Sequence, residues 1–199
     1  IEYRLLQAYN SYSGGRQMLE IHVTGLDGVD LAGDLTMKIM LGTSLDRSRR
    51  HTLQAVPITK DGKPLLIHSG EMNLSVRHMT SAAEKAVDFN HALGQMIGNW
   101  NEEIMPMLGF MFECDQLTQK DIYLCMDGIL DDAKLPKTSV EEIKKAMKRK
   151  KLSNIAEGVE MVSEYADTLI SPMNREKTSE AVGKAVAKRI SKLMKEKSA

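Results

Sequence analysis

Residues 72–84 read MNLSVRHMTSAAE, and within them the spacing of apolar residues changes from every second residue to helical spacing. In the first half, Met72, Leu74 and Val76 fall on one side of an alternating pattern, which is typical of a half-buried strand. In the second half, Ser81 and Glu84 form a capping box, which marks the start of a helix. We therefore expect strands before this stretch and helices after it.

The sequence before this stretch favours further strands. Alternating or short apolar runs occur at residues 18–23, 35–41, 53–58 and 65–68. Asp61-Gly62 lies between the last two runs and predicts a hairpin that joins them. Pro57 and Pro64 favour an edge position for these two strands, because proline cannot donate a hydrogen bond to a sheet.

The sequence after this stretch favours helices up to the C-terminus. An apolar stripe with helical spacing follows the capping box and consists of Ala86, Phe89, Leu93, Met96 and Trp100. Pro106 suits the first turn of a short helix. Thr118 and Thr138, each followed three residues later by an acidic residue, predict the starts of two more. A fifth apolar stripe covers residues 155–169, and the last helix is expected to begin at about Ser179.

Strands followed by helices predict an α+β fold, with an N-terminal antiparallel β-sheet and a helical C-terminal part. The composition becomes basic near residues 131–137, where a proline also lies. We therefore expect a β-rich α+β body over residues 1–133 and a basic helical extension over residues 134–199.

Charged residues are distributed unequally along the chain. The whole sequence balances 27 Lys and Arg against 27 Asp and Glu, but residues 134–199 hold 16 against 9 and residues 1–133 hold 11 against 18. The extension therefore has a net charge of +7 and the body a net charge of −7. This asymmetry favours a protein whose basic end meets an anion: nucleic acid, an acidic membrane surface or a second copy of the chain.

No motif indicates catalysis or a cofactor. The sequence contains no P-loop, no dinucleotide-binding glycine fingerprint and no nucleophile elbow, so we expect a non-enzymatic protein without a cofactor. Cys114 and Cys125 have no histidine near them in sequence, which favours two ordinary thiols in a reducing compartment over a zinc site. Asp131 and Asp132 offer two carboxylates to a divalent ion, although a solvated pair is the more common case.

The strongest candidate site is the segment KKAMKRKK at residues 144–151, in which no acidic residue follows Glu142 to pair with the cations. The candidate residues are Lys144, Lys145, Lys148, Arg149, Lys150 and Lys151. Such a run binds nucleic acid by releasing counterions, lies on anionic lipid or acts as a nuclear import signal. The alternative is the solvated face of a surface helix. We favour that alternative for the lysines of the last helix, Lys184, Lys188, Lys192 and Lys195.

A second candidate is the apolar element at residues 104–112, which is shorter than the ~20 residues that a membrane span needs. Its candidate contact residues are Met105, Met107, Leu108, Phe110, Met111 and Phe112. Exposed patches of Met and Phe mark contacts, so these residues are candidates for self-association or for membrane contact. The alternative is a buried helix beneath the sheet, and we consider it the more common case.

The order of elements over residues 71–112 resembles a known family. Residues 71–79, EMNLSVRHM, form an alternating strand, an Ala-rich helix ends near IGNW at 97–100, and a short apolar segment contains MLGFM at 107–111. This order is similar to that of the matrix proteins of rhabdoviruses. The resemblance implies a small α+β virion protein that self-associates, condenses the nucleocapsid and contacts the inner leaflet of the envelope.

The resemblance also implies partners and a location. The partners are further copies of the chain, the viral nucleocapsid with its RNA and an anionic membrane surface, in the virion and in the cytoplasm or nucleus of the host cell. Residues 138–199 depart from the family pattern, because they look wholly helical where familiar members from animal viruses end in mixed structure. A divergent, plant-infecting member that assembles in the nucleus would make residues 144–151 a signal for the import machinery. The alternative function is a nucleic-acid-binding regulatory protein that uses the basic helices directly.

Overall fold

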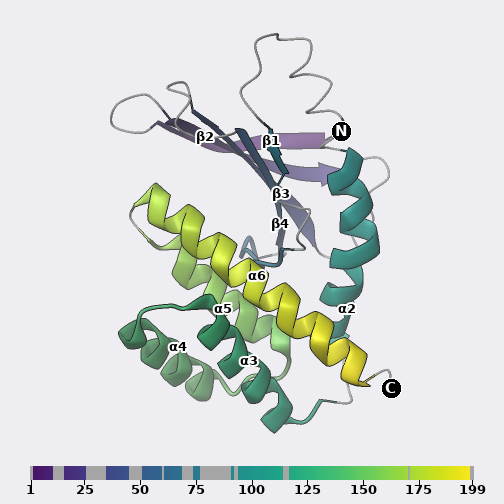
Figure 1. Cartoon of the computed structure of the whole chain (residues 1–199), viewed down its shortest axis with the longest axis vertical. Helices are drawn as coiled ribbons and strands as arrows, with labels where there is room; N and C mark the ends of the chain where they lie inside the picture. Colours follow the sequence, from purple (N-terminus) through teal and green to yellow (C-terminus); the bar gives the residue numbers. More distant parts are fainter. Residues whose placement is uncertain are drawn as a thin grey trace. The chain divides into compact units, whose positions relative to one another are not determined.

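The computed structural model of the chain describes residues 2–10, 16–25, 35–44, 51–59, 61–68, 74–76, 91, 94–113, 117–169 and 171–197. The chain forms two compact units (Figure 1). The sheet unit comprises residues 1–60 and 70–103, and the helical unit comprises residues 61–69 and 104–199. This division differs from the expected boundary after residue 133, which falls inside the helical unit.

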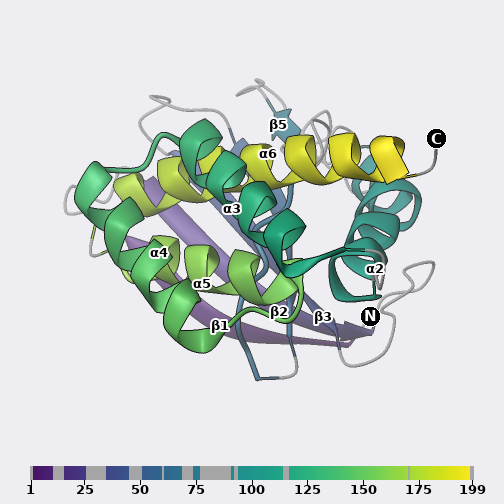
Figure 2. The ribbon, with the colours of Figure 1, turned by 90° about the horizontal axis from the view of Figure 1, so that it is seen from below.

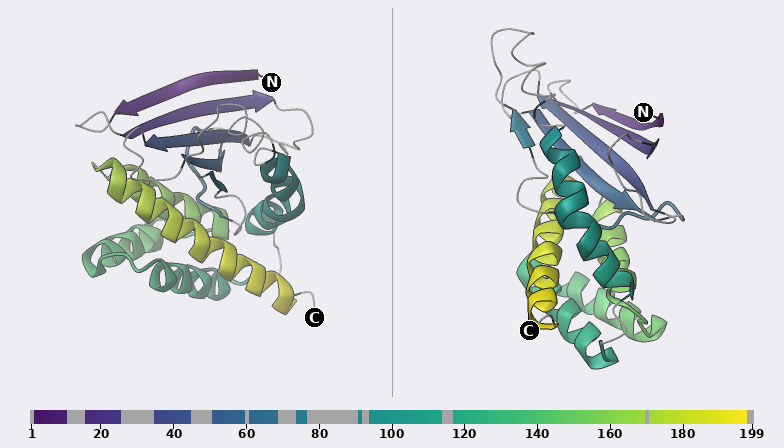
Figure 3. Two further views of the ribbon diagram at one scale, coloured as in Figure 1. Left: turned by 45° about the horizontal axis from the view of Figure 1, so that its top comes forward. Right: turned by 90° about the vertical axis from the view of Figure 1, so that its right-hand side faces the viewer.

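The sheet unit is built on one antiparallel sheet with the strands in sequence order (Figure 3). The strands are β1 (Glu2–Asn10), β2 (Arg16–Gly25), β3 (Thr36–Ser44), β4 (His51–Ile58) and β5 (Leu74–Val76). Strands therefore precede helices, and the predicted α+β fold is confirmed. The expected strands at 18–23, 35–41 and 53–58 lie within or largely within β2, β3 and β4, whereas β1 was not predicted.

The register of the sheet explains why alternation predicted these strands. Cross-strand rows in β2, β3 and β4 are Leu19–Leu41–Leu53, Ile21–Ile39–Ala55 and Val23–Met37–Pro57. Because side chains along a strand alternate between the two faces, these rows share one face of the sheet. Met37 and Ala55 are fully buried, so this face contributes to a core, but the pair Lys38 and Val56 on the other face is buried as well.

The expected hairpin between residues 53–58 and 65–68 is wrong. The antiparallel partner of β4 is β5, with Leu53 opposite Leu74, and residues 61–68 belong to the helical unit. The reason is that this inserted segment (residues 61–68) makes its hydrogen bonds within the helical unit: the N–H of Leu66 donates to Ser163 and the N–H of His68 donates to the carbonyl of Gly183. Its last four residues, Leu65 to His68, are buried.

The other regular elements of the described chain are helices, and residues 94–99 are also helical. They are η1 (Trp100–Ile104, a π-helix), α2 (Met105–Glu113), α3 (Gln119–Ala133), α4 (Lys137–Lys150), α5 (Ile155–Asp167) and α6 (Pro172–Lys197). In the helical unit, α6 packs against α2, α3 and α5, and α4 packs against α5 (Figure 2). None of the helices in the described ranges is long and apolar enough to cross a membrane.

The start of α3 agrees with its predicted cap, whereas the starts of α4 and α6 differ from the prediction. Thr118 caps α3 as predicted, because its side chain accepts a hydrogen bond from the backbone N–H of Asp121 and its own N–H donates to the Asp121 carboxylate. By contrast, α4 begins after Pro136 with no side-chain cap, and α6 begins at Pro172 rather than near Ser179. Proline fits the first turn of a helix, so both prolines start helices. The predicted capping box at residues 81–84 lies outside the described residues.

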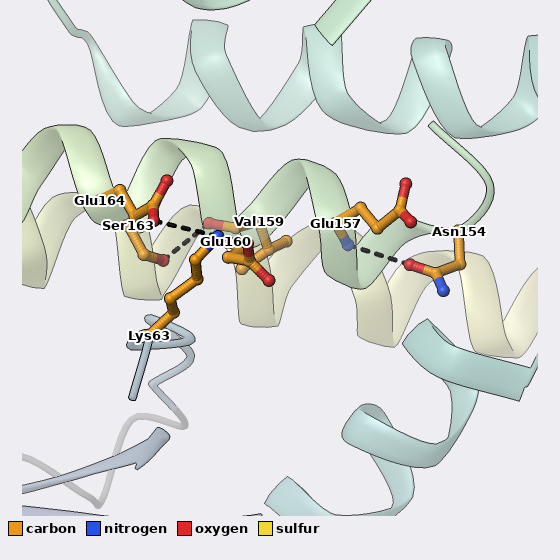
Figure 4. A network of polar contacts seen from close by, with 7 residues as sticks. All are labelled: Lys63, Asn154, Glu157, Val159, Glu160, Ser163 and Glu164. Carbon is orange, nitrogen blue, oxygen red and sulfur yellow. Dashed lines mark hydrogen bonds and ion pairs between the residues drawn. The ribbon is translucent and has the colours of Figure 1, made fainter. Parts of the chain in front are cut away.

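The inserted segment is held by α5 and α6. The backbone N–H of Leu66 donates to Ser163 Oγ on α5 at 2.9 Å, and that of His68 donates to the carbonyl of Gly183 on α6 at 3.1 Å. Lys63 Nζ lies 2.5 Å from a carboxylate oxygen of Glu160 on α5 (Figure 4). The bonds of Leu66 and His68 satisfy backbone donors that would otherwise be buried without a partner.

His68 is buried as a neutral imidazole. Only 2% of its surface is exposed, and this burial lowers the pKa of His68 from about 6.5 to about 4. Glu180 opposes the lowering of the pKa and Lys184 reinforces it, both from α6. The folded state therefore binds a proton at His68 less readily than the unfolded state does.

This neutral histidine predicts acid sensitivity. Its stabilising contribution is complete above the unfolded pKa of about 6.5 and is lost as the pH falls toward 4. We expect the free energy of unfolding, measured with urea, to fall by about 2 kcal/mol more between pH 7 and pH 5 in the wild type than in His68→Gln. An equal response to pH in both proteins would show that His68 is not the group responsible.

Gly183 allows the inserted segment to approach α6. A Cβ atom at this position would overlap the imidazole ring of His68, whereas a Cβ at Gly109 in α2 would meet nothing within 4 Å. We therefore expect Gly183→Ala to lower the free energy of unfolding by about 1–3 kcal/mol. The control Gly109→Ala should raise it by about 0.5–1 kcal/mol, because alanine favours a helix. Urea denaturation of both variants checks the opposite signs, and equal stability of the two would contradict the packing.

Candidate anion-binding surface

Helix α4 is fixed by one buried face. Ser139, Ile143 and Met147 recur every four residues and are the buried residues of this helix. The Ser139 hydroxyl lies 2.6 Å from that of Tyr165 on α5, and the hydroxyl of Tyr123 on α3 donates to the carbonyl of Met147 at 3.2 Å. These contacts set the rotation of α4, so the opposite face is turned to solvent.

The exposed end of α4 carries a cluster of cations, which we call the basic surface. It consists of Lys145, Lys148, Arg149, Lys150 and Lys151, and all five residues are exposed. Lys151 ends the helix in the left-handed conformation with φ 56°, and its N–H donates to the carbonyl of Met147 at 3.0 Å. Within the part of the chain that the structure describes, no ion pair involves any of these five cations.

Lys144 differs from the other cations of the segment. Its Nζ atom lies 2.9 Å from Oδ1 of Asp127 on α3. The hydrogen bond to Asp127 raises the pKa of the Lys144 ammonium, so Lys144 is charged at neutral pH. The expectation that no acidic residue pairs with this segment is thus wrong for Lys144. Sequence reasoning missed Asp127 because no local spacing links two residues on different helices.

Three of the four candidate lysines of α6 have acidic partners, in contrast to the basic surface, and no ion pair within the described residues involves Lys195. Lys184 pairs with Glu180 at 2.5 Å, and Lys192 lies 3.7 Å from Glu196 on the same helix. Lys188 lies 3.3 Å from the carboxylate of Asp132, which also accepts a 2.8 Å hydrogen bond from Arg189. Such exposed pairs agree with an ordinary solvated face.

The expected Asp131–Asp132 carboxylate pair is not assembled into a metal centre in the described chain. The described residues include no group of three His, Cys, Asp or Glu side chains placed to hold a metal ion. Cys125 is a buried thiol, and burial raises its pKa to about 11, so it remains protonated. Cys114 lies outside the described residues. Among the described residues, the exposed charged side chains are therefore the main candidates for binding.

The charge asymmetry is much smaller when charges are counted by folded unit than when they are counted along the sequence. The helical unit holds 18 Lys and Arg against 16 Asp and Glu, and the sheet unit holds 9 against 11. The net charges are +2 and −2, far smaller than the +7 and −7 of the linear division. Acidic residues of α3, including Asp127 and Asp132, lie in the same unit as the basic helices and account for part of the difference. The candidate for anion binding is therefore the local cluster of cations on α4, and the net charge of the unit does not indicate it.

The apolar element at residues 104–112 is mostly core. Met107, Leu108 and Met111 are buried, Met105 and Phe110 are half-buried, and Phe112 is 39% exposed. The buried residues lie on α2, which packs against α5 and α6. Of the six predicted contact residues, Phe112 alone is classed as exposed, and three are enclosed within the helical unit.

These exposures predict different effects of truncation in α2. We expect Leu108→Ala to lower the free energy of unfolding by about 2–4 kcal/mol, because it leaves a cavity in the core. Phe112→Ala should change it by less than about 1 kcal/mol, since much of the ring already contacts solvent. Chemical denaturation of the two variants measures both effects. A stable Leu108→Ala protein would instead support the interpretation of this residue as a contact site.

Comparison with known proteins adds no assignment. No family model matches the sequence, and neither the curated proteins nor the solved structures contain a match. Function is therefore argued from the basic surface and from the burial of the remaining candidate residues.

Proposed function

We propose that the chain is a non-enzymatic structural protein of the viral matrix type that binds a polyanion through the basic surface. The observation that carries the proposal is the cluster of five exposed cations at the end of α4, without ion pairs in the described chain. Because α4 is held by its buried face, the cations are positioned before any ligand arrives. Their release of counterions would drive association with phosphate groups.

The resemblance of residues 71–112 to rhabdovirus matrix proteins supports the matrix type. In that role the chain would bridge the nucleocapsid RNA and the anionic inner membrane surface, and would act in the virion and in the cytoplasm or nucleus of the host cell. The same basic surface is the segment that the nuclear import machinery would recognise. Copies of the chain would associate into a layer, with the exposed Phe112 among the candidate contacts.

Two strongly perturbed groups support a non-enzymatic function. His68 and Cys125 have the largest pKa shifts among the described residues, and burial is the main cause in each case. His68 lies in the packing of the inserted segment, and Cys125 is a buried residue of α3. Neither is exposed to a substrate in the way that a catalytic acid, base or nucleophile is.

Neutralising the basic surface tests the binding function. We expect the change of Lys145, Lys148, Arg149 and Lys150 to Gln to abolish binding to single-stranded RNA and to anionic vesicles at about 0.1 M salt. The matched control changes Lys184, Lys188, Lys192 and Lys195 to Gln, which removes the same charge from a different helix. The control should bind both probes nearly as the wild type does, as measured by fluorescence anisotropy and vesicle flotation. Equal losses in both variants would indicate a general effect of net charge and would contradict the proposed surface.

The ability to form ordered assemblies distinguishes the two functions that the basic surface could serve. A matrix-type protein should form ordered layers or tubes with RNA or anionic vesicles, visible by electron microscopy, and should sediment as oligomers. The alternative is a nucleic-acid-binding regulatory protein, which would bind RNA or DNA without forming layers. The burial of Met107, Leu108 and Met111 favours this alternative over a purely membrane-binding role, because it removes three apolar side chains from the membrane-facing set.

A further inference from the structure

Acidic residues flank the basic surface on α4. Glu141 lies one helical turn before Lys145, and Glu142 lies three residues before it; both carboxylates are exposed. Residues three and four apart are neighbours on a helix surface, so these carboxylates share the solvent face with the first cations of the cluster. A flat anionic membrane that covered this face would also meet Glu141 and Glu142. An extended polyanionic chain could instead cross the end of α4 without contacting either carboxylate.

Among the described residues of the helical unit, those next to the basic surface offer no exposed aromatic ring on which bases could stack. The sequence of α4 contains no aromatic residue, and the two tyrosines of α3 and α5 are half-buried. Their hydroxyls are engaged by α4, Tyr123 with the Met147 carbonyl and Tyr165 with Ser139. Sequence-tolerant proteins that stack bases need exposed aromatic rings, whereas lysine and arginine alone contact the phosphates.

Asp127 controls how many cations can contact a ligand. Its carboxylate lies 2.9 Å from the Lys144 ammonium, and both side chains are partly exposed, Lys144 at 37% and Asp127 at 51%. A phosphate that approached Lys144 would therefore also approach a negative charge. The ion pair leaves five of the six cations of the segment available.

We propose that the ligand of the basic surface is the phosphate backbone of a nucleic acid, contacted without base readout, and that Asp127 weakens this binding by holding Lys144 out of contact. This inference rests on the proposed function and names the partner of the same surface. Asp127 acts as an intramolecular competitor of the phosphate. Its removal should increase the affinity, which is the opposite of the usual effect of a surface substitution.

Counterion release gives the expected size of the effect. Five phosphate contacts on a single strand predict a slope of about −3.5 for the logarithm of the binding constant against the logarithm of salt concentration. A sixth contact, made available by Asp127→Asn, changes the slope to about −4.2 and tightens binding about fivefold at about 0.1 M salt. Lys144→Gln alone should leave the slope and the affinity nearly unchanged.

The experiment measures binding of the full chain to a labelled oligouridylate by fluorescence anisotropy over a series of salt concentrations. The variants are Asp127→Asn, Lys144→Gln and the double variant. The control is Glu113→Gln, which removes one exposed carboxylate from α2, at the opposite end of the helical unit from α4 (Figure 2). We expect tighter binding by Asp127→Asn alone, with the double variant and the control close to the wild type. Urea denaturation confirms that each variant is folded.

Four results would overturn the inference. If the double variant binds as tightly as Asp127→Asn, the gain comes from general electrostatics and not from Lys144. If an oligoadenylate and an oligouridylate bind with clearly different affinities, bases are being read. If the wild type binds anionic phosphatidylserine vesicles but not RNA, the ligand is lipid, and the proposed polyanion-binding function still stands. Binding to neither probe would refute both the inference and the proposed function.

Discussion

The inserted segment is the constraint on which the helical unit depends. Four consecutive buried residues, Leu65 to His68, cannot be accommodated unless their backbone N–H groups find partners away from water. Ser163 on α5 and the carbonyl of Gly183 on α6 supply two of these partners. A glycine is required at position 183, because α6 can approach the His68 ring only where no Cβ intervenes. The segment thereby couples α5 to α6 through the core of the unit.

The position of the candidate site follows from this coupling. Helix α4 packs against α5, where Ser139 contacts Tyr165. Helix α3 packs against α6, where Asp132 forms an ion pair with Arg189. Helix α3 in turn places Asp127 beside Lys144. The number of cations available on α4 is therefore decided by helices that contribute no cation to the cluster. A substitution in the core between α5 and α6 could alter the surface without touching it.

Patterns among residues close in sequence predicted individual strands and the start of α3. Alternation located β2, β3 and β4, and the residues Thr118 and Asp121 located the start of α3, because these patterns need only nearby residues. The pairs Leu66–Ser163 and Lys144–Asp127 join residues that are distant in sequence, so no spacing indicated them. Strand β1 was missed for a different reason: its register with β2 shifts between Leu5 and Gln7, which breaks a simple alternation. The sequence identified the cations of the candidate site, but it did not show that Lys144 pairs with Asp127.

An unpaired cluster of cations at the end of a helix also needs a physical explanation, since like charges repel. Cations at a helix C-terminus interact favourably with the unsatisfied carbonyls, each by about 0.3–1 kcal/mol when exposed. Repulsion between like charges spaced three or four residues apart costs about 0.2–0.5 kcal/mol for each pair. The two effects are similar in size, so Lys148, Arg149 and Lys150 can remain without acidic partners at little net cost to folding. Within the described chain, the positive charge at the end of α4 thus remains without an acidic partner, whereas acidic neighbours pair with Lys184, Lys188 and Lys192 on α6.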